Sequence, residues 1–147
     1  MDNSQVQVIL QLVLAVVLGG VIGLEREFKG KEAGLQTYSL VTLGACLFTI
    51  VNFELFNFFA GETSISFDPS RIIQAVAIGI GFIGAGVIIY RRDHVEGITT
   101  AAGLWCSAAI GVAVGIRVYF LALLATLLAT IILFVLGELE RKFLGRD

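Results

Sequence analysis

Charged and hydroxyl side chains stand at the ends of long apolar segments, where a membrane protein can place reactive groups beside water. Glu25 and Arg26 end the first apolar segment, and Thr99 and Thr100 stand near the start of a later one. An ion pair at such a boundary is less screened than one in open water. We expect a regulatory or partner-docking site made of Glu25, Arg26, Gly34, Thr37, Arg92, Gly97, Thr99 and Thr100. The alternative is that the charges only set membrane topology and that Thr99 or Thr100 only caps a helix.

Polar residues within the apolar segments recur at helical spacing. Tyr38, Thr42, Ala45, Thr49 and Asn52 fall on one face of a helix, and a later segment repeats the pattern from Thr100 through Ser107. Such faces either line a polar path or mediate helix–helix contact, and the second role is the commoner one in membrane bundles. The polar intramembrane positions are Thr42, Thr49, Asn52, Gln74 and Ser107.

Other kinds of chemistry find little support. Gly79, Gly81 and Gly84 form a G-x-G-x-x-G pattern, but it lies inside an apolar segment, without the preceding strand that nucleotide binding requires. We expect the one histidine, His94, to be a solvated loop residue, because the sequence does not indicate a group that would orient it as a catalytic base. A net charge of −2 does not favour nucleic acid. We therefore expect no catalytic residue, metal site or cofactor.

The composition is that of a membrane protein. Hydrophobic residues make up 57% of the 147 residues and charged residues 15%, and the mean hydropathy is +0.92. Five apolar segments are long enough to cross a bilayer. The expected fold is an all-α bundle of five transmembrane helices within residues 1–137, followed by a short cytoplasmic tail, 138–147. The expected spans are residues 6–24, 35–59, 69–89, 98–116 and 120–136.

The basic residues predict the orientation. Eight of the ten lie in the first loop, the third loop and the tail: Arg26, Lys29, Lys31, Arg91, Arg92, Arg141, Lys142 and Arg146. Only Arg71 and Arg117 lie at the other end. By the positive-inside rule, the N-terminus is outside and the C-terminus is in the cytoplasm.

Glycines mark the expected helix contacts. In the third span, which begins at an Asp68-Pro69 helix-start signal, Gly79 and Gly86 face one side and Gly81 and Gly84 the other. Small residues on two sides allow two neighbouring helices to come close. We therefore expect the third span to be the central helix. The expected packing glycines are Gly79, Gly81, Gly84, Gly86, Gly111 and Gly115.

Three blocks together resemble the MgtC/SapB family of bacterial inner-membrane proteins. They are GLEREFKGKEAGLQTYSLVTLGA (residues 23–45), RIIQAVAIGIGFIGAGVII (71–89) and VEGITTAAGLWCSAAIGVAVG (95–115). The chain departs from the family at Gln36, where the motif usually has arginine. It also ends where better-known members continue into a cytoplasmic regulatory domain.

The resemblance implies a multi-pass protein of the bacterial inner membrane, associated with magnesium limitation or acid stress. For some members of the family, the resemblance also implies inhibition of F-type ATP synthase through the membrane part of that complex. We expect a non-enzymatic protein that modulates a membrane partner or ion homeostasis. The alternative is a small transporter or channel, with Mg²⁺ as the candidate ion. The expected partners are the lipid bilayer, a membrane complex of this kind and a second copy of the chain, but not nucleic acid.

Overall fold

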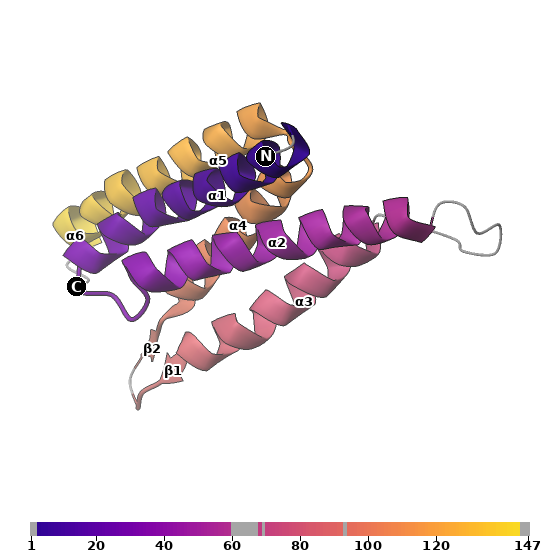
Figure 1. Cartoon of the computed structure of the whole chain (residues 1–147). Coiled ribbons are helices and arrows are strands. Elements are labelled where there is room, and N and C mark those ends of the chain that lie inside the picture. Colours follow the sequence, from indigo (N-terminus) through magenta and orange to yellow (C-terminus); the bar gives the residue numbers. More distant parts are fainter. Residues whose placement is uncertain (1–2, 60–67, 69, 93, 145–147) are drawn as a thin grey trace.

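Long helices make up nearly all of the structure, a computed structural model that describes residues 3–59, 68, 70–92 and 94–144 (Figure 1). Five stretches within these residues are long and apolar enough to cross a membrane, as predicted. They are α1 (Asn3–Phe28), α2 (Leu35–Phe59), α3 (Ser70–Val87), α4 (Ile98–Gly115) and the stretch Tyr119–Leu139. The expected link at 61–67, together with Pro69, Arg146 and the end of the tail, lies outside the described residues.

The fifth span does not end where the apolar segment ends. The helix α5 (Tyr119–Ile131) passes into a π-helical turn, η1 (Ile132–Leu136), and then into α6 (Gly137–Leu144). The described part of the predicted tail therefore continues the helix.

The third loop holds a short antiparallel hairpin that the sequence pattern did not predict. Its strands are β1 (Ile89–Tyr90) and β2 (Val95–Glu96), with Ile89 opposite Glu96. Consequently α3 ends at Val87, earlier than the predicted 89. At the other end of α3, the Asp68 carboxylate accepts a hydrogen bond from the Ser70 backbone N–H at 2.9 Å, as the helix-start signal predicted.

The central helix is α4, not α3. It contacts α1, α2, α3 and α5. Of the residues in its membrane-length apolar stretch, 61% are buried, against 11% for α3. Figure 1 shows α3 at the edge of the bundle. The prediction of α3 as the central helix is wrong, because small residues permit close packing but do not require it.

The glycines of α3 confirm this correction. A Cβ added at Gly79, Gly81 or Gly86 would meet nothing within 4 Å among the described residues, so these three do not mediate packing between the described helices. Gly84 does face α4, where an added Cβ would lie 3.5 Å from Ala101 Cβ.

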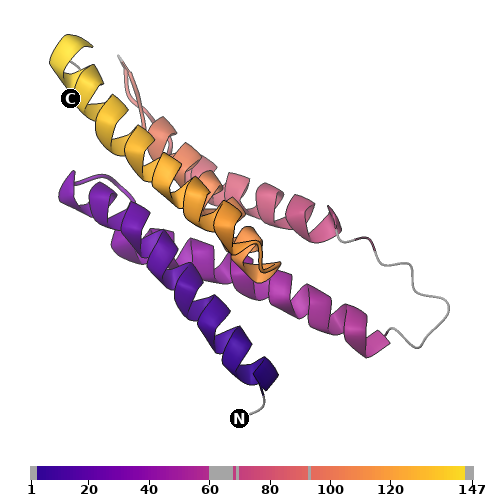
Figure 2. The same cartoon turned by 90° about the horizontal axis from the view of Figure 1, so that it is seen from above.

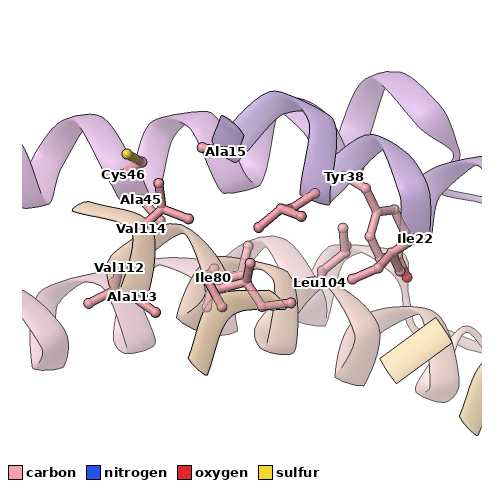
Figure 3. Close-up of a cluster of buried hydrophobic side chains, with 14 of the residues drawn as sticks. Ala15, Ile22, Tyr38, Ala45, Cys46, Ile80, Leu104, Val112, Ala113 and Val114 are labelled. Atoms are coloured by element: carbon pink, nitrogen blue, oxygen red, sulfur yellow. The ribbon is translucent and has the colours of Figure 1, made fainter. Parts of the chain in front are cut away.

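The closest helix contacts join α2 to α4 and α1. An added Cβ at Gly111 would lie 2.9 Å from Ala45 Cβ, and one at Gly115 would lie 2.6 Å from Thr49 Cβ. Gly19 of α1 approaches Thr42 in the same way. Around these contacts lies the hydrophobic core, where Ile22, Tyr38 and Leu104 meet (Figure 3). The core thus lies between α1, α2 and α4 and fixes how their ends meet.

Candidate functional site

The candidate site begins with Arg26, which is buried in the last turn of α1 and only 4% exposed. Its terminal Nη2 donates a hydrogen bond to Thr100 Oγ1 at 3.0 Å. The Thr100 hydroxyl in turn donates to Glu32 Oε2 at 3.1 Å. Thr100 therefore links a buried cation on α1 to a carboxylate on the loop between α1 and α2. The hydroxyl thus acts once as acceptor and once as donor.

Tyr38 ties α2 to the same point. It is fully buried, and its hydroxyl donates to the Thr100 carbonyl at 3.3 Å. Gly103, one helical turn beyond Thr100, makes room for it, because an added Cβ there would overlap the Tyr38 hydroxyl. Figure 3 shows the Tyr38 ring standing near Ile22 of α1 and Leu104 of α4.

Glu25 and Lys29 form an ion pair beside Arg26. Lys29 Nζ lies 2.7 Å from Glu25 Oε1, one helical turn apart on α1. The Glu25 side chain is only 8% exposed, and its other oxygen is 3.8 Å from Arg26 Nη1. We call Glu25, Arg26, Lys29 and Glu32, together with Tyr38 and Thr100, the charged cluster. Its two acidic and two basic side chains balance.

Lys29 also reaches the fifth span at its π-helical turn. Its ammonium donates to the Leu133 carbonyl at 3.1 Å and lies 5.3 Å from the centre of the Phe134 ring. Gly137 leaves room for it, since an added Cβ there would lie 3.2 Å from Lys29 Nζ. A π turn interrupts the regular helical hydrogen-bond ladder, and such turns are frequent at functional sites.

The loop that carries Glu32 is shaped by two glycines. Gly30 has φ of +60°, a conformation that glycine adopts without strain. Gly34 lies directly beneath the Glu27 carboxylate, which would overlap any added Cβ. That carboxylate accepts a hydrogen bond from the Leu35 backbone N–H at 3.0 Å, at the start of α2. Gly34 therefore lets the Glu27 carboxylate reach the start of α2, and a side chain at this position would require Glu27 to move.

Several polar atoms of the charged cluster are buried without a hydrogen bond. Among the described residues, Arg26 Nε and both Glu25 oxygens have no partner of hydrogen-bond geometry, despite the ion-pair distances. A buried donor or acceptor that is left without a partner costs about 1–3 kcal/mol, and more if it is charged. The charges of the cluster thus balance, but three of its buried polar atoms lack a hydrogen bond within the part of the chain that the structure describes. A change of charge on any member therefore disturbs the others.

The structure brings together part of the predicted site. Arg26 and Thr100 touch directly and Glu25 lies beside them, whereas the side chains of Thr37, Arg92 and Thr99 form no hydrogen bond or ion pair within the described residues. No side chain caps α4, because its cap position is Gly97, at φ of +85°. The alternative that Thr99 or Thr100 serves as the cap is therefore wrong. Gly97 has a backbone role: an added Cβ would overlap the Val87 carbonyl.

Sequence reasoning missed Glu32 and the contact between Lys29 and Leu133. Glu32 lies on a loop, where periodicity carries no information. The signal for Lys29 was its spacing of four residues from Glu25, which places the two on one helix face. The π-helical turn has no sequence signature that we recognise.

The hairpin, at the same end of the bundle as the loop between α1 and α2 (Figure 1, Figure 2), carries its own polar contacts. Arg91 Nε lies 3.2 Å and His94 Nε2 lies 2.9 Å from the two oxygens of Glu96. The hydrogen bond from His94 and then that from Arg91 lower the pKa of the Glu96 carboxyl.

The polar intramembrane residues lie mostly at helix contacts. Thr42 and Thr49 are fully buried, and each hydroxyl donates to its own helix at 2.8 Å, to the carbonyls of Tyr38 and Ala45. Ser107 is buried with no hydrogen-bond partner for its hydroxyl in the described part of the chain, and so is the Asn52 amide nitrogen. Gln74, in contrast, is exposed on α3.

Gln11 is a buried polar residue that the sequence analysis did not single out. Its amide nitrogen donates to the carbonyls of Val114 and Gly115, at 3.0 and 2.9 Å. It therefore satisfies the carbonyl end of α4 from inside the bundle.

The fold and the site together define a small five-helix membrane protein with a buried charged cluster at one end of the bundle. The chain belongs to the MgtC family, whose profile matches residues 12–142. Over 139 residues it is 38% identical to the "Putative magnesium transporter YhiD" of Escherichia coli K12, covering 95% of this chain and 65% of that protein.

Two further relatives agree with this assignment. The chain is 42% identical over 120 residues to the "Protein MgtC" of Salmonella typhimurium strain 14028s, which covers 82% of this chain and 48% of MgtC. It is 37% identical over 141 residues to the "Protein SrpB" of Synechococcus elongatus, covering 89% and 75% respectively. The chain thus spans about half of MgtC and 65% of YhiD. No solved structure matches the chain.

Proposed function

We propose that this protein is a non-enzymatic component of the bacterial inner membrane that modulates a membrane partner or ion homeostasis under magnesium limitation or acid stress. The charged cluster is the proposed point of regulation or docking. Family membership, together with the name of YhiD, supports the link to magnesium. A membrane complex such as the membrane part of F-type ATP synthase is the candidate partner class.

The observation that carries this proposal is that the polar face of α2 is packed against a neighbouring helix. Its buried hydroxyls are bonded back to their own helix, and Gly111 and Gly115 pack against them from α4. A hydration path needs polar groups that face open space. Here the same groups support close contact between helices. Three of the five buried polar side-chain atoms that lack a hydrogen bond in the described residues belong instead to Glu25 and Arg26, at one end of the bundle.

The second candidate is a small Mg²⁺ transporter, which the name of YhiD favours. The unsatisfied Ser107 hydroxyl and Asn52 amide are the groups that a path through the bundle would use. Among the described residues, no group of three or more His, Cys, Asp or Glu side chains could hold a metal ion. A transporter would therefore have to pass Mg²⁺ hydrated, or through an assembly of several copies.

Reconstitution of the full chain in liposomes loaded with a Mg²⁺-sensitive dye separates the two candidates. The modulator proposal expects the Mg²⁺ signal to match that of empty liposomes. A protein-dependent Mg²⁺ flux that is reduced by Ser107→Val would overturn it in favour of transport.

The role of the charged cluster is tested in cells. We predict that Glu25→Gln and Thr100→Val each abolish growth of a complemented deletion strain in low Mg²⁺ at unchanged membrane abundance. Thr99→Val is the matched control, because the Thr99 side chain is exposed and forms no hydrogen bond within the described residues. If Glu25→Gln and Thr100→Val both complement fully, the cluster is only structural.

A further inference from the structure

An apolar groove runs along the outside of the bundle between α3 and α4. Its volume is about 250 Å³, and apolar side chains line it throughout. Ile80, Val112 and Ala113 are less than 10% exposed and form its floor. Ile73, Trp105 and Leu121 are at least half exposed and form its walls. The groove therefore opens sideways, toward the space that lipid occupies around a membrane bundle.

The groove lies next to a close contact between α3 and α4. They meet where Gly84 faces Ala101, toward the hairpin. The lining residues occupy the other half of both helices, from Ile80 and Trp105 to Ile73 and Ile116. On α4 this stretch covers about 16 Å at 1.5 Å per residue. Half of a hydrocarbon core of about 30 Å is nearly the same length. The groove is thus as long as one leaflet is thick.

Two arginines stand at the outer end of the groove. Arg71 lies two residues before the lining residue Ile73, and Arg117 directly follows the lining residue Ile116. The Arg71 side chain is 83% exposed, and Asp68 approaches only its Nε, at 4.0 Å. Arg117 is exposed, has no ion pair within the described residues, and has φ of +65°, unusual for a residue other than glycine. These are the two basic residues at this end of the bundle.

We propose that the groove binds one anionic phospholipid, with an acyl chain against α3 and α4 and the headgroup phosphate held by Arg71 and Arg117. Arginine's planar fork suits phosphate oxygens. A second copy fits the groove less well. Two copies related by an axis along the membrane normal would bring the same arginines together, and such like charges repel.

Trp105 supplies a direct test, because it is the one tryptophan of the chain and lies on the groove wall. The full chain is placed in vesicles of phosphatidylcholine and phosphatidylglycerol, with the bromine-labelled acyl chains carried by one lipid or the other. Bromine quenches tryptophan fluorescence on contact. We expect stronger quenching when the phosphatidylglycerol is brominated, at equal mole fraction. Arg71→Gln or Arg117→Gln should each reduce this preference about five-fold, the change that corresponds to about 1 kcal/mol per basic residue.

Matched variants test the headgroup and the groove separately. Arg91→Gln with Arg92→Gln removes two charges at the opposite end and should leave the preference unchanged. Ala77→Phe fills the groove and should abolish the preference, whereas Ala75→Phe, exposed on the same helix outside the groove lining, should not. Equal quenching by both lipids, or a preference that survives Ala77→Phe, would overturn the proposal. So would protection of Trp105 from both lipids together with crosslinked dimers, which would place a second copy in the groove.

Discussion

Burying an arginine at the end of an apolar bundle costs free energy unless its charge and its N–H groups find partners. Arg26 finds Thr100 on one side and Glu25 on the other, yet its Nε stays without a hydrogen bond in the described structure. Thr100 is the pivotal neutral residue, because its hydroxyl joins Arg26 to Glu32 and its carbonyl accepts from Tyr38. Replacing that single hydroxyl would therefore break the links from α4 to Arg26 and to Glu32, whereas the hydrogen bond from Tyr38 to the carbonyl would remain.

The pair of Glu25 and Lys29 should behave as a coupled unit. We predict that Glu25→Gln and Lys29→Met each lower the free energy of unfolding in detergent by about 1–3 kcal/mol, and that the double variant loses clearly less than the sum. The reason is that each single change leaves a charge without its partner, and the double change does not.

Unfolding by denaturant, followed through the helical signal, measures this double-mutant cycle. Arg91→Gln is the control, because the Arg91–Glu96 pair is largely exposed and water and salt screen such surface pairs. Additive effects of Glu25→Gln and Lys29→Met would contradict the coupling.

At the residue scale, the sequence allowed the site to be predicted where position carried the information. Arg26 and Thr100 were predicted because both stand at the same end of predicted spans, and the structure joins them. Glu32 could not be predicted, since the path of a loop is set by the helices around it. The contact from Lys29 to Leu133 depends on a backbone irregularity over 100 residues further along the chain.

At the element scale, close approach of α2 and α4 is the strongest packing feature. We predict that Gly111→Leu destabilises the bundle by at least the 1–3 kcal/mol typical of overpacking, because the Thr42 carbonyl and Ala45 leave no room for a side chain. Gly81→Leu, on the open face of α3, should change the stability of the single chain by less than about 0.5 kcal/mol.

Thermal unfolding in detergent compares the two variants. Equal loss of stability in both would mean that Gly81 is packed after all, against another copy, and concentration dependence would then reveal the assembly.

The spans themselves were predictable because hydrophobic length alone selects them. The mutual arrangement of the spans could not be predicted. Glycines show where a helix can be approached closely, but they do not determine which neighbouring helix packs there. α3 has four such glycines but presents only Gly84 to α4. The polar face of α2 was the better guide: Tyr38, Thr42 and Thr49 are all buried. In a lipid-facing helix such side chains would be costly, so they had to face protein.

At the scale of the whole molecule, the ends of the helices sort the charges. The charged cluster and the hairpin lie at one end, and Arg71 and Arg117 lie at the other. The distribution of eight basic residues against two predicts that the cluster end is cytoplasmic. This orientation remains a prediction, since the arrangement of helices is the same whichever way the bundle is inserted.

Cysteine labelling tests the orientation. In a background with Cys46 and Cys106 replaced by alanine, we predict that a membrane-impermeant maleimide added to intact cells or spheroplasts labels Ser64→Cys and not Lys31→Cys. After permeabilisation both should react, which controls for folding and access. Labelling of Lys31→Cys alone from outside would mean that the bundle is inserted in the opposite orientation.

The π-helical turn η1 has a consequence for how the length of this chain can change. Such a turn accommodates one residue more than the α-helical turn it replaces. Deleting one residue of Ile132–Leu136 would therefore restore a regular helix, and the span would survive a change that breaks most helices. The residues after the deletion would keep their helical phase, because the π turn absorbs the extra residue, but the widened turn whose Leu133 carbonyl accepts from Lys29 would be gone. Relatives that differ by a single residue here would keep the span, but their counterpart of Lys29 would need a different acceptor.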